Sequence, residues 1–289
     1  MLTNILHLTD FSSSSDAAFH WAMAIARANQ AKLLVLHVLV PNALAYMAPD
    51  YSPQIALDAQ EKCACDEMRR MREHLVGLPH DMILRRNSDV WMAVERELGK
   101  ARSDMIVLGT HGRTGLNKLL LGSVAERVLR CSMVPVMTVG PGVVPMESDG
   151  KFHRLLFATD FTLGSAAAGQ YAGTLVNRDE AELTLLYTFT PGKPAGSETS
   201  SELSVAEAFH RLDELARDTD TPRGRTHTFV EFGDAGAKIL DVAMKTKADL
   251  IMMGVGKAKS IFAATHLEIG TIHNVVAQAS CPVLTVPPS

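Results

Sequence analysis

The chain has 289 residues, of which 47% are hydrophobic and 21% charged, and its formal net charge is -4. This composition excludes collagen-like, disordered and disulfide-scaffold proteins, and at roughly 150 residues per domain the length predicts two soluble globular domains. A charge so close to balance argues against a protein that mainly coats nucleic acid or an anionic membrane, although it leaves room for a local anion site.

The cysteines and the N-terminal segment indicate the compartment. The cysteines are too few and too scattered for a disulfide framework or a zinc site, and they are Cys63, Cys65, Cys131 and Cys281. The first residues show no basic region followed by an apolar one, and no run of about 18 apolar residues occurs. We therefore expect a cytoplasmic protein that is neither exported nor membrane-spanning, and we expect no metal centre built by its side chains.

The first 140 residues alternate between predicted strands and helices. An apolar run at 4–8 predicts a strand, and the serines at 12–15 supply N-caps for a helix whose apolar positions recur at helical spacing. Further strands are expected at 32–40, 82–86, 105–108 and 134–139, and further helices at 54–75, 90–101 and 123–131.

The same order of elements returns after residue 150. Strands are expected at 154–158, 183–189, 226–230, 250–253 and 283–286, and helices at 165–175, 203–217, 235–246 and 271–278. Mostly apolar strands that alternate with helices predict a parallel sheet covered on both faces. The predicted fold class is α/β, with a five-stranded doubly wound sheet in each half.

Three short segments occur twice, in the same order. Ile5–Ser12 resembles Leu155–Thr162, and Ser103–Gly109 resembles Ala248–Gly254. The third pair is Val134–Val139 and Cys281–Val286. We interpret the chain as two copies of one domain, at 1–140 and 152–289, joined by a Gly/Pro-containing linker at 141–151.

The residues after the strand at 105–108 carry the strongest functional signal. Gly109, Gly112 and Gly122-Ser123 precede the helix at 123–131, and Arg113 adds a positive charge. Glycines let the backbone approach a ligand closely, and a helix N-terminus offers unpaired N–H groups to a phosphate. Ligands of doubly wound sheets bind beyond the carboxyl ends of the strands, where this loop would lie. The loop therefore predicts a phosphate site, although it matches neither a Walker loop nor a dinucleotide fingerprint.

The spacing of these residues resembles the G-2x-G-9x-G-S/T motif of nucleotide-binding universal stress proteins. The resemblance extends over nearly the whole chain, because Thr-Asp follows the first strand of each half and Pro-Val lies in or near the last strand of each half. It implies an adenine nucleotide alpha hydrolase-like fold that binds ATP, ADP or AMP, with or without Mg. The nucleotide-binding residues that it implies are Thr9, Asp10, Val38, Leu108, Gly109, Gly112, Arg113, Gly122, Ser123 and Val124.

The second half keeps only part of this motif. Lys257 stands where the second motif glycine would fall, and Phe262 adds apolar bulk to the loop. We expect a degenerate partner domain rather than a second nucleotide site, and both interpretations stay open. The residues that a second site would use are Thr159, Asp160, Gly254, Gly256, Gly270 and Thr271.

The last predicted strand of each half, at 134–139 and 283–286, is apolar and lacks the charged residues that protect an exposed sheet edge. Universal stress proteins pair their domains through this strand, so the resemblance implies that the two halves pair within one chain. A homodimer of the whole chain is compatible with the sequence.

The favoured function is an ATP-binding regulatory protein of the stress response. Catalysis would need a positioned base or nucleophile and usually a metal held by carboxylates, and Asp10 is the one acid at a strand end of the first half that is well placed. We interpret His111 as a polar lining residue rather than a general base. No catalytic residue is assigned, and weak ATPase activity is compatible with the sequence. The alternatives are a slow ATPase or adenylyl-transferring enzyme and a nucleotide-independent partner-binding module.

Overall fold

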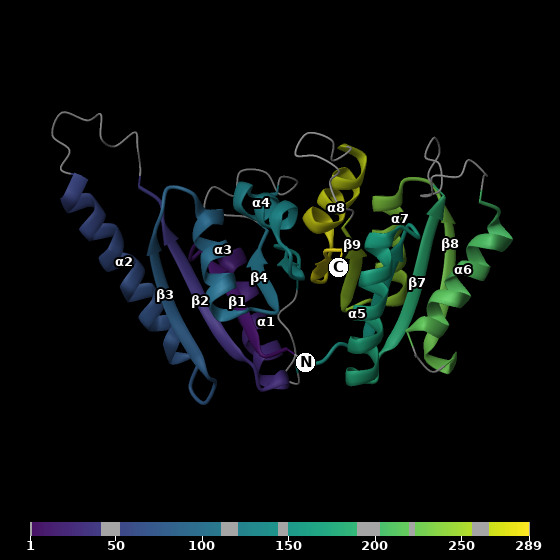
Figure 1. The fold of residues 1–289 in the computed structure, drawn as a ribbon, viewed down its shortest axis with the longest axis horizontal. Coiled ribbons are helices and arrows are strands. Elements are labelled where there is room, and N and C mark those ends of the chain that lie inside the picture. The colour runs from purple at the N-terminus through teal and green to yellow at the C-terminus, as the bar shows by residue number, and fades with distance from the viewer. Residues whose placement is uncertain are drawn as a thin grey trace.

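The structure is a computed structural model, and it describes residues 2–41, 53–110, 121–143, 150–189, 203–219, 223–255 and 266–288. Within these residues the strands form one ten-stranded sheet in the order β3-β2-β1-β4-β5-β10-β9-β6-β7-β8. Figure 1 shows the two halves side by side, with the first half on the left and α4 and α8 near the centre.

Both halves have the predicted alternation of strands and helices. The first half contains β1 (Asn4–Thr9), α1 (Ser13–Asn29), β2 (Lys32–Leu39), α2 (Pro53–Glu73), β3 (His80–Arg86), α3 (Val90–Ala101), β4 (Met105–Gly109), α4 (Ser123–Cys131) and β5 (Val136–Val139). The second half contains β6 (Arg154–Thr159), α5 (Leu163–Asp179), β7 (Glu182–Phe189), α6 (Val205–Asp218), a 3-10 turn (Arg223–Arg225), β8 (Thr226–Phe232), α7 (Ala235–Thr246), β9 (Leu250–Gly254), α8 (His266–Gln278) and β10 (Val283–Val286). The predicted α/β class is confirmed.

Several predicted boundaries are wrong, and two of them have a clear local reason. β5 begins at Val136 rather than Val134, because Pro135 has no N–H group to donate to a neighbouring strand. α5 begins at Leu163, since the hydroxyl of Thr162 caps it. α8 begins at His266 instead of Thr271, so Gly270 lies inside the helix, where a Cβ atom would meet no neighbour within 4 Å.

Helices cover both faces of the sheet, and each face has its own core. Successive strand residues point to opposite faces, so Ile5 packs in one core and Leu6 in the other. The first core includes Phe19 of α1 and Leu212 of α6, and the second includes Val128 of α4. Each core contains residues of both halves and is therefore continuous across the joint.

The joint between the halves is an antiparallel pairing of β5 with β10, in which Val283 lies opposite Thr138. The hydroxyl of Thr138 donates to the carbonyl oxygen of Val283 at 3.2 Å, and the hydroxyl of Thr285 donates to that of Val136 at 3.2 Å. These two hydrogen bonds are equivalent in the two halves, because the repeat places a threonine at the same position of each last strand. They tie the sheet together at its centre.

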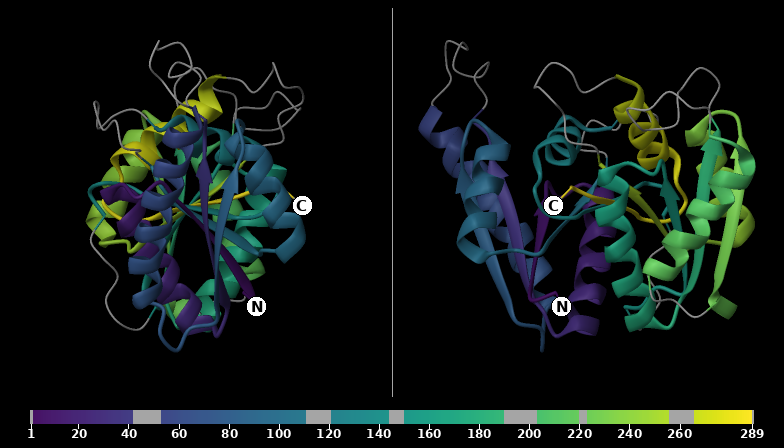
Figure 2. Two further views of the ribbon diagram at one scale, coloured as in Figure 1. Left: turned by 90° about the vertical axis from the view of Figure 1, so that its left-hand side faces the viewer. Right: turned by 45° about the vertical axis from the view of Figure 1, so that its right-hand side comes forward.

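On one face of the sheet, α1 and α5 lie side by side (Figure 2). Arg178 Nη1 of α5 donates to Asn29 Oδ1 of α1 at 2.6 Å. The ring of Trp21 stacks on Phe152 with 6.0 Å between the ring centroids. Across the part of the chain that is described, no helix is both long and apolar enough to cross a membrane.

Candidate functional site

The winding direction of the sheet reverses at the carboxyl ends of β1 and β4, the place where doubly wound sheets form a crevice. The chain passes from β1 to β2 and β3 on one side and then crosses back to β4 on the other side of β1. In such sheets the ligand site lies where the winding direction reverses. Leu8 of β1 pairs with Leu108 of β4, so Asp10, the first residue after β1, and Gly109, the last residue of β4, lie at neighbouring strand ends. We refer to this place as the switch-point crevice.

The turn after β1 holds Thr9 and Asp10 through its own hydrogen bonds. Thr9 Oγ1 accepts from the N–H of Phe11 at 3.1 Å and from the Ser15 hydroxyl at 2.8 Å. Asp10 Oδ1 accepts from the N–H of Ser12 at 3.0 Å and from its hydroxyl at 2.6 Å. Thr9 is therefore buried beneath the start of α1, whereas Asp10 is half-buried beside the crevice.

A histidine that the sequence analysis did not consider supports this turn. His37 lies opposite Thr9 in the sheet register, and its Nδ1–H donates to the Thr9 carbonyl oxygen at 2.7 Å. Its ring lies 4.3 Å from the ring of Phe11, which has a left-handed backbone with φ 62°. The strand register is the signal that would have linked His37 to the turn, and a single sequence does not reveal it.

Gly109 is required by the packing of α1. A Cβ atom at this position would lie 2.7 Å from the carbonyl carbon, the carbonyl oxygen and Oγ of Ser14. Real Cβ atoms do not approach other atoms so closely, so the first motif glycine lets α1 lie directly against β4. Its presence has a structural explanation, whether or not a ligand also approaches it.

The two ends of the motif loop meet beside the crevice. The N–H of Thr110 donates to the Val139 carbonyl oxygen at 3.1 Å, and the carbonyl oxygen of Thr110 accepts from the N–H of Gly122 at 2.8 Å. These bonds hold the start of α4 against the end of β4. The predicted residues Gly112 and Arg113, together with His111, lie outside the described residues.

The N-terminus of α4 has the features of an anion site. Gly122 is its N-cap, with extended backbone angles of φ -63° and ψ 144°, and it has no side chain to accept from the first-turn N–H groups. Ser123 and Val124 form the first turn, and Val124 is 38% exposed. Backbone N–H groups and the positive end of the helix dipole both favour a phosphate at this position.

The two predicted apolar contacts are in different environments. Leu108 is 3% exposed and packs in the core that also contains Val94 of α3 and Val128 of α4. Val38 lies one residue before the end of β2 and is half-buried against the same core. The structure thus brings the predicted residues at the ends of β1 and β4 close to the first turn of α4. Val38 lies one strand away, in β2.

The second half repeats the turn but not the helix N-terminus. Asp160 Oδ1 accepts from the hydroxyls of Thr162 and Ser165 at 2.6 Å each, and Thr159 is buried as Thr9 is. By contrast, Gly270 and Thr271 lie inside α8. Gly254 ends β9, and Gly256 lies outside the described residues. The second half therefore has no helix N-terminus at Gly270-Thr271.

The structure thus consists of two tandem doubly wound α/β units, and the first has a glycine-capped helix at its switch point. This places the chain among the doubly wound α/β proteins, a class whose ligand sites generally lie at strand ends. A model of the universal stress protein family matches residues 1–140 and 151–287. The chain therefore belongs to the universal stress protein family.

Individual relatives agree with this assignment. A universal stress protein of Mycolicibacterium smegmatis is 24% identical over 292 residues, which cover 98% of this chain and 97% of that protein. The universal stress protein A homolog 1 of Coxiella burnetii is 30% identical over 138 residues, 47% of this chain and 94% of its own length. The crystal structure of a universal stress protein from Archaeoglobus fulgidus matches in fold, with a TM-score of 0.72, 22% identity and coverage of 99% and 96% of the two chains.

Proposed function

We propose that the first half binds an adenine nucleotide in the switch-point crevice and that this binding serves a regulatory role in the stress response. The observation that carries the proposal is the N-terminus of α4, which Gly122 caps. The Gly122 N–H donates to the Thr110 carbonyl oxygen at 2.8 Å, and this bond holds the helix start beside the end of β4. A phosphate at this position would meet the first-turn N–H groups without competition from a capping side chain at Gly122.

The proposal gives the predicted residues separate tasks. Gly122, Ser123 and Val124 bind the phosphates, together with Gly112 and Arg113 of the motif loop. Asp10 contacts the nucleoside, because it follows β1 beside the crevice. Thr9 acts indirectly, since its hydroxyl is already bonded to Phe11 and Ser15 and supports the turn that holds Asp10.

The hydrogen bonds that Asp10 already accepts favour a binding role over a catalytic one. Its Oδ1 already accepts two hydrogen bonds from Ser12, so this oxygen is committed to the turn rather than to proton abstraction from water. Asp10 would also be the carboxylate that ligates Mg if Mg accompanied ATP. We infer that the halves act as one regulatory unit joined through β5 and β10, and that the chain works in the cytoplasm.

The test is to denature freshly purified protein, identify any released nucleotide by mass spectrometry, and titrate emptied protein with ATP, ADP and AMP by calorimetry. We include cAMP, the ligand of one solved universal stress protein. The double variant Gly122→Val, Ser123→Ala should lose binding, because the valine side chain would occupy the space beside the N–H groups. The matched control, Gly270→Val with Thr271→Ala, changes the equivalent residues inside α8 and should bind as the unmodified chain does.

Protein that contains no nucleotide and binds none of these ligands would overturn the proposal. Equal loss in both double variants would show that damage to the fold, rather than loss of the site, explains the result. Metal-dependent, saturable ATP hydrolysis that is abolished by Asp10→Asn would favour the enzyme alternative.

A further inference from the structure

The first half contains a hollow that is remote from the carboxyl ends of the strands. It has a volume of about 620 Å³ and lies between α3 and strands β1 to β3. Its lining includes Asn4, Lys32 and His80, the first residues of these three strands, and Ala101, the last residue of α3. The strands are parallel, so their first residues lie at the edge of the sheet opposite the carboxyl ends. We call this hollow the α3 groove.

A buried carboxylate organises the charged side of the α3 groove. Glu97 of α3 is only 4% exposed, and its Oε1 accepts from Arg85 Nε at 2.8 Å and from Lys100 Nζ at 3.0 Å. The hydrogen bond from Arg85 is the main reason that the pKa of Glu97 lies below its ordinary value. One negative charge therefore holds two positive head groups, and the cluster has a net charge of one positive unit. Because Arg85 and Lys100 are already oriented, binding an anion costs them less conformational entropy.

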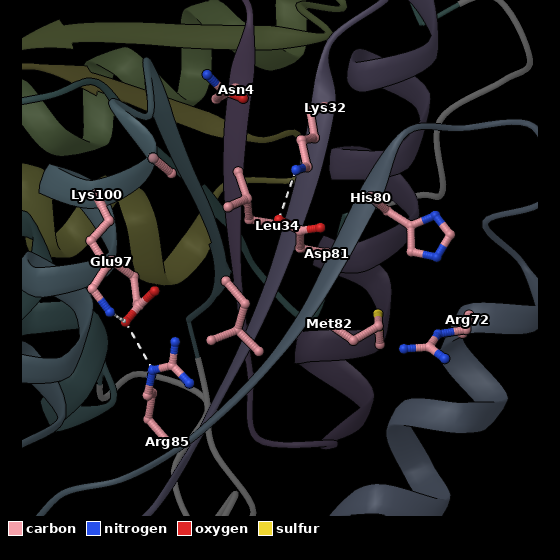
Figure 3. A pocket seen from close by; sticks show the side chains of 12 residues that line it. Asn4, Lys32, Leu34, Arg72, His80, Asp81, Met82, Arg85, Glu97 and Lys100 are labelled. Carbon is pink, nitrogen blue, oxygen red and sulfur yellow. Dashed lines mark hydrogen bonds and ion pairs between the residues drawn. The ribbon is translucent and has the colours of Figure 1, made fainter.

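The remaining charged residues raise this positive excess. Lys32 and Asp81 form a neutral pair with 2.7 Å between Nζ and Oδ2. Arg72, in the last turn of α2, also lines the groove. Figure 3 shows Arg85, Glu97 and Lys100 on one side of β3 and Arg72 on the other, so the groove passes around this edge strand. Counted over its lysines, arginines, aspartate and glutamate alone, the lining carries two net positive charges.

The inner wall of the α3 groove is apolar. Leu34 is 4% exposed and Ile83 9% exposed, and both belong to the core beneath α3. Ala101 packs against the same core. Because little of either side chain is exposed, this wall fits a compact apolar body beside the charged end.

The second half provides an internal comparison. It has a hollow at the equivalent place, but with a volume of about 240 Å³. The strand register places Glu182 where Lys32 stands in the first half, and His227 where Asp81 stands. At the position of Glu97 in the equally long α7 stands Val242, which is fully buried. The repeated fold thus accounts for a hollow at this place, whereas the cationic cluster belongs to the first half alone and is not needed to build the fold.

We propose that the α3 groove is a binding site for a small phosphate monoester, or a dianion of similar size, that carries an apolar body. Lys100 and Arg85 contact the anionic group, Glu97 positions these two cations, and Leu34 and Ile83 contact the apolar body. The anionic group meets the net positive charge of the Arg85–Glu97–Lys100 cluster, and Arg72 adds a second positive charge on the other side of β3. This site is independent of the proposed nucleotide site, which lies at the opposite ends of the strands.

The test uses phenyl phosphate as the probe and the full chain labelled with ¹⁵N for NMR titration at low ionic strength. Saturable shifts are expected at the amides of Ile83, Arg85 and Lys100. Lys100→Met should weaken binding about five- to tenfold, the loss expected for one hydrogen bond to a charged group that is half exposed, while Arg85 keeps Glu97 paired. The control Lys245→Met changes the equivalent position of α7 and should leave the affinity unchanged.

Four results would overturn the proposal. They are the absence of saturable shifts, shifts confined to Gly109 and Ser123 at the switch-point crevice, unchanged affinity in Lys100→Met, and equal binding of uncharged benzyl alcohol. None of them depends on whether the chain binds ATP, so failure here is distinguishable from failure of the proposed nucleotide site.

Discussion

Replacement of His7 by phenylalanine is expected to stabilise the first half and to remove most of its loss of stability in mild acid. The ring of His7 is fully buried in β1 and packs against Phe19 of α1, with 5.6 Å between the ring centroids. Its Nδ1–H donates to the Val107 carbonyl oxygen at 3.1 Å, whereas Nε2 is buried without a hydrogen-bond partner among the described residues. The repeat has Phe157 at this position, equally buried, which shows that the fold accepts an apolar ring there.

Burial lowers the pKa of His7 from 6.5 to about 4, chiefly because the charged imidazolium would lose its water. The unfolded chain therefore takes up a proton first as the pH falls below 6.5. The folded state then loses stability until the pH reaches the folded-state pKa of about 4. This change in pKa corresponds to about 3 kcal/mol over the whole window, of which about 2 kcal/mol is lost by pH 5. At neutral pH protonation of His7 no longer affects stability. The free energy of unfolding of the variant is then higher by about 1 kcal/mol, because no buried polar nitrogen is left unpaired.

Tryptophan fluorescence is a selective probe for this experiment, since both tryptophans of the chain, Trp21 and Trp91, lie in the first half. Urea unfolding should give a higher midpoint for His7→Phe at pH 7.5, and the difference from the unmodified chain should grow at pH 5. The control His210→Gln removes an exposed histidine of α6 and should change neither value. Equal acid sensitivity of His7→Phe and the unmodified chain would refute the assignment of a neutral, desolvated ring.

Three further substitutions test particular contacts. Gly109→Ala should lower the free energy of unfolding by about 1–3 kcal/mol, because its Cβ would overlap the Ser14 backbone; an unchanged thermal midpoint would contradict this packing. Thr138→Val at the β5–β10 joint removes one hydroxyl donor, and urea unfolding should show a loss of about 1 kcal/mol, with no loss counting against the joint. Gly150→Ala combines a φ of +68° with a Cβ that would lie 2.4 Å from the Ala24 carbonyl oxygen; we expect a loss of more than 1 kcal/mol by calorimetry, and a stable variant would disprove the close approach.

Much of the fold follows from local patterns in the sequence. Apolar runs predicted the strands, and the N-cap serines predicted the start of α1, where the hydroxyl of Ser12 accepts from the N–H of Ser15 at 3.2 Å. The repeat predicted that the second half would copy this order, and its element order agrees. These predictions succeed because periodicity and capping depend on neighbours within a few residues.

The parts of the site that the sequence did not reveal depend on contacts between distant segments. The steric need for Gly109 arises from Ser14, almost a hundred positions earlier, and only the packing of α1 on β4 brings them together. The support of Thr9 by His37 depends on strand register in the same way. Gly270 illustrates a different limit, because a glycine before a predicted helix resembles an N-cap even where the helix starts upstream.

The comparison of the two halves separates residues that build the fold from residues that favour a ligand. The Thr-Asp turn occurs in both halves, and in each the aspartate Oδ1 accepts from the N–H and hydroxyl two residues further on. Each turn also contains a left-handed phenylalanine, Phe11 or Phe161, with φ of 62° and 60°. Since the second half keeps this turn after losing the glycine spacing, the turn is explained by the need to start α1 and α5, and by itself it is no evidence for a nucleotide. The glycine cap of α4 differs between the halves, and the fold does not require it. The case for nucleotide binding therefore depends on Gly122 and the first turn of α4 more than on Asp10, and variants at Gly122 test it most directly.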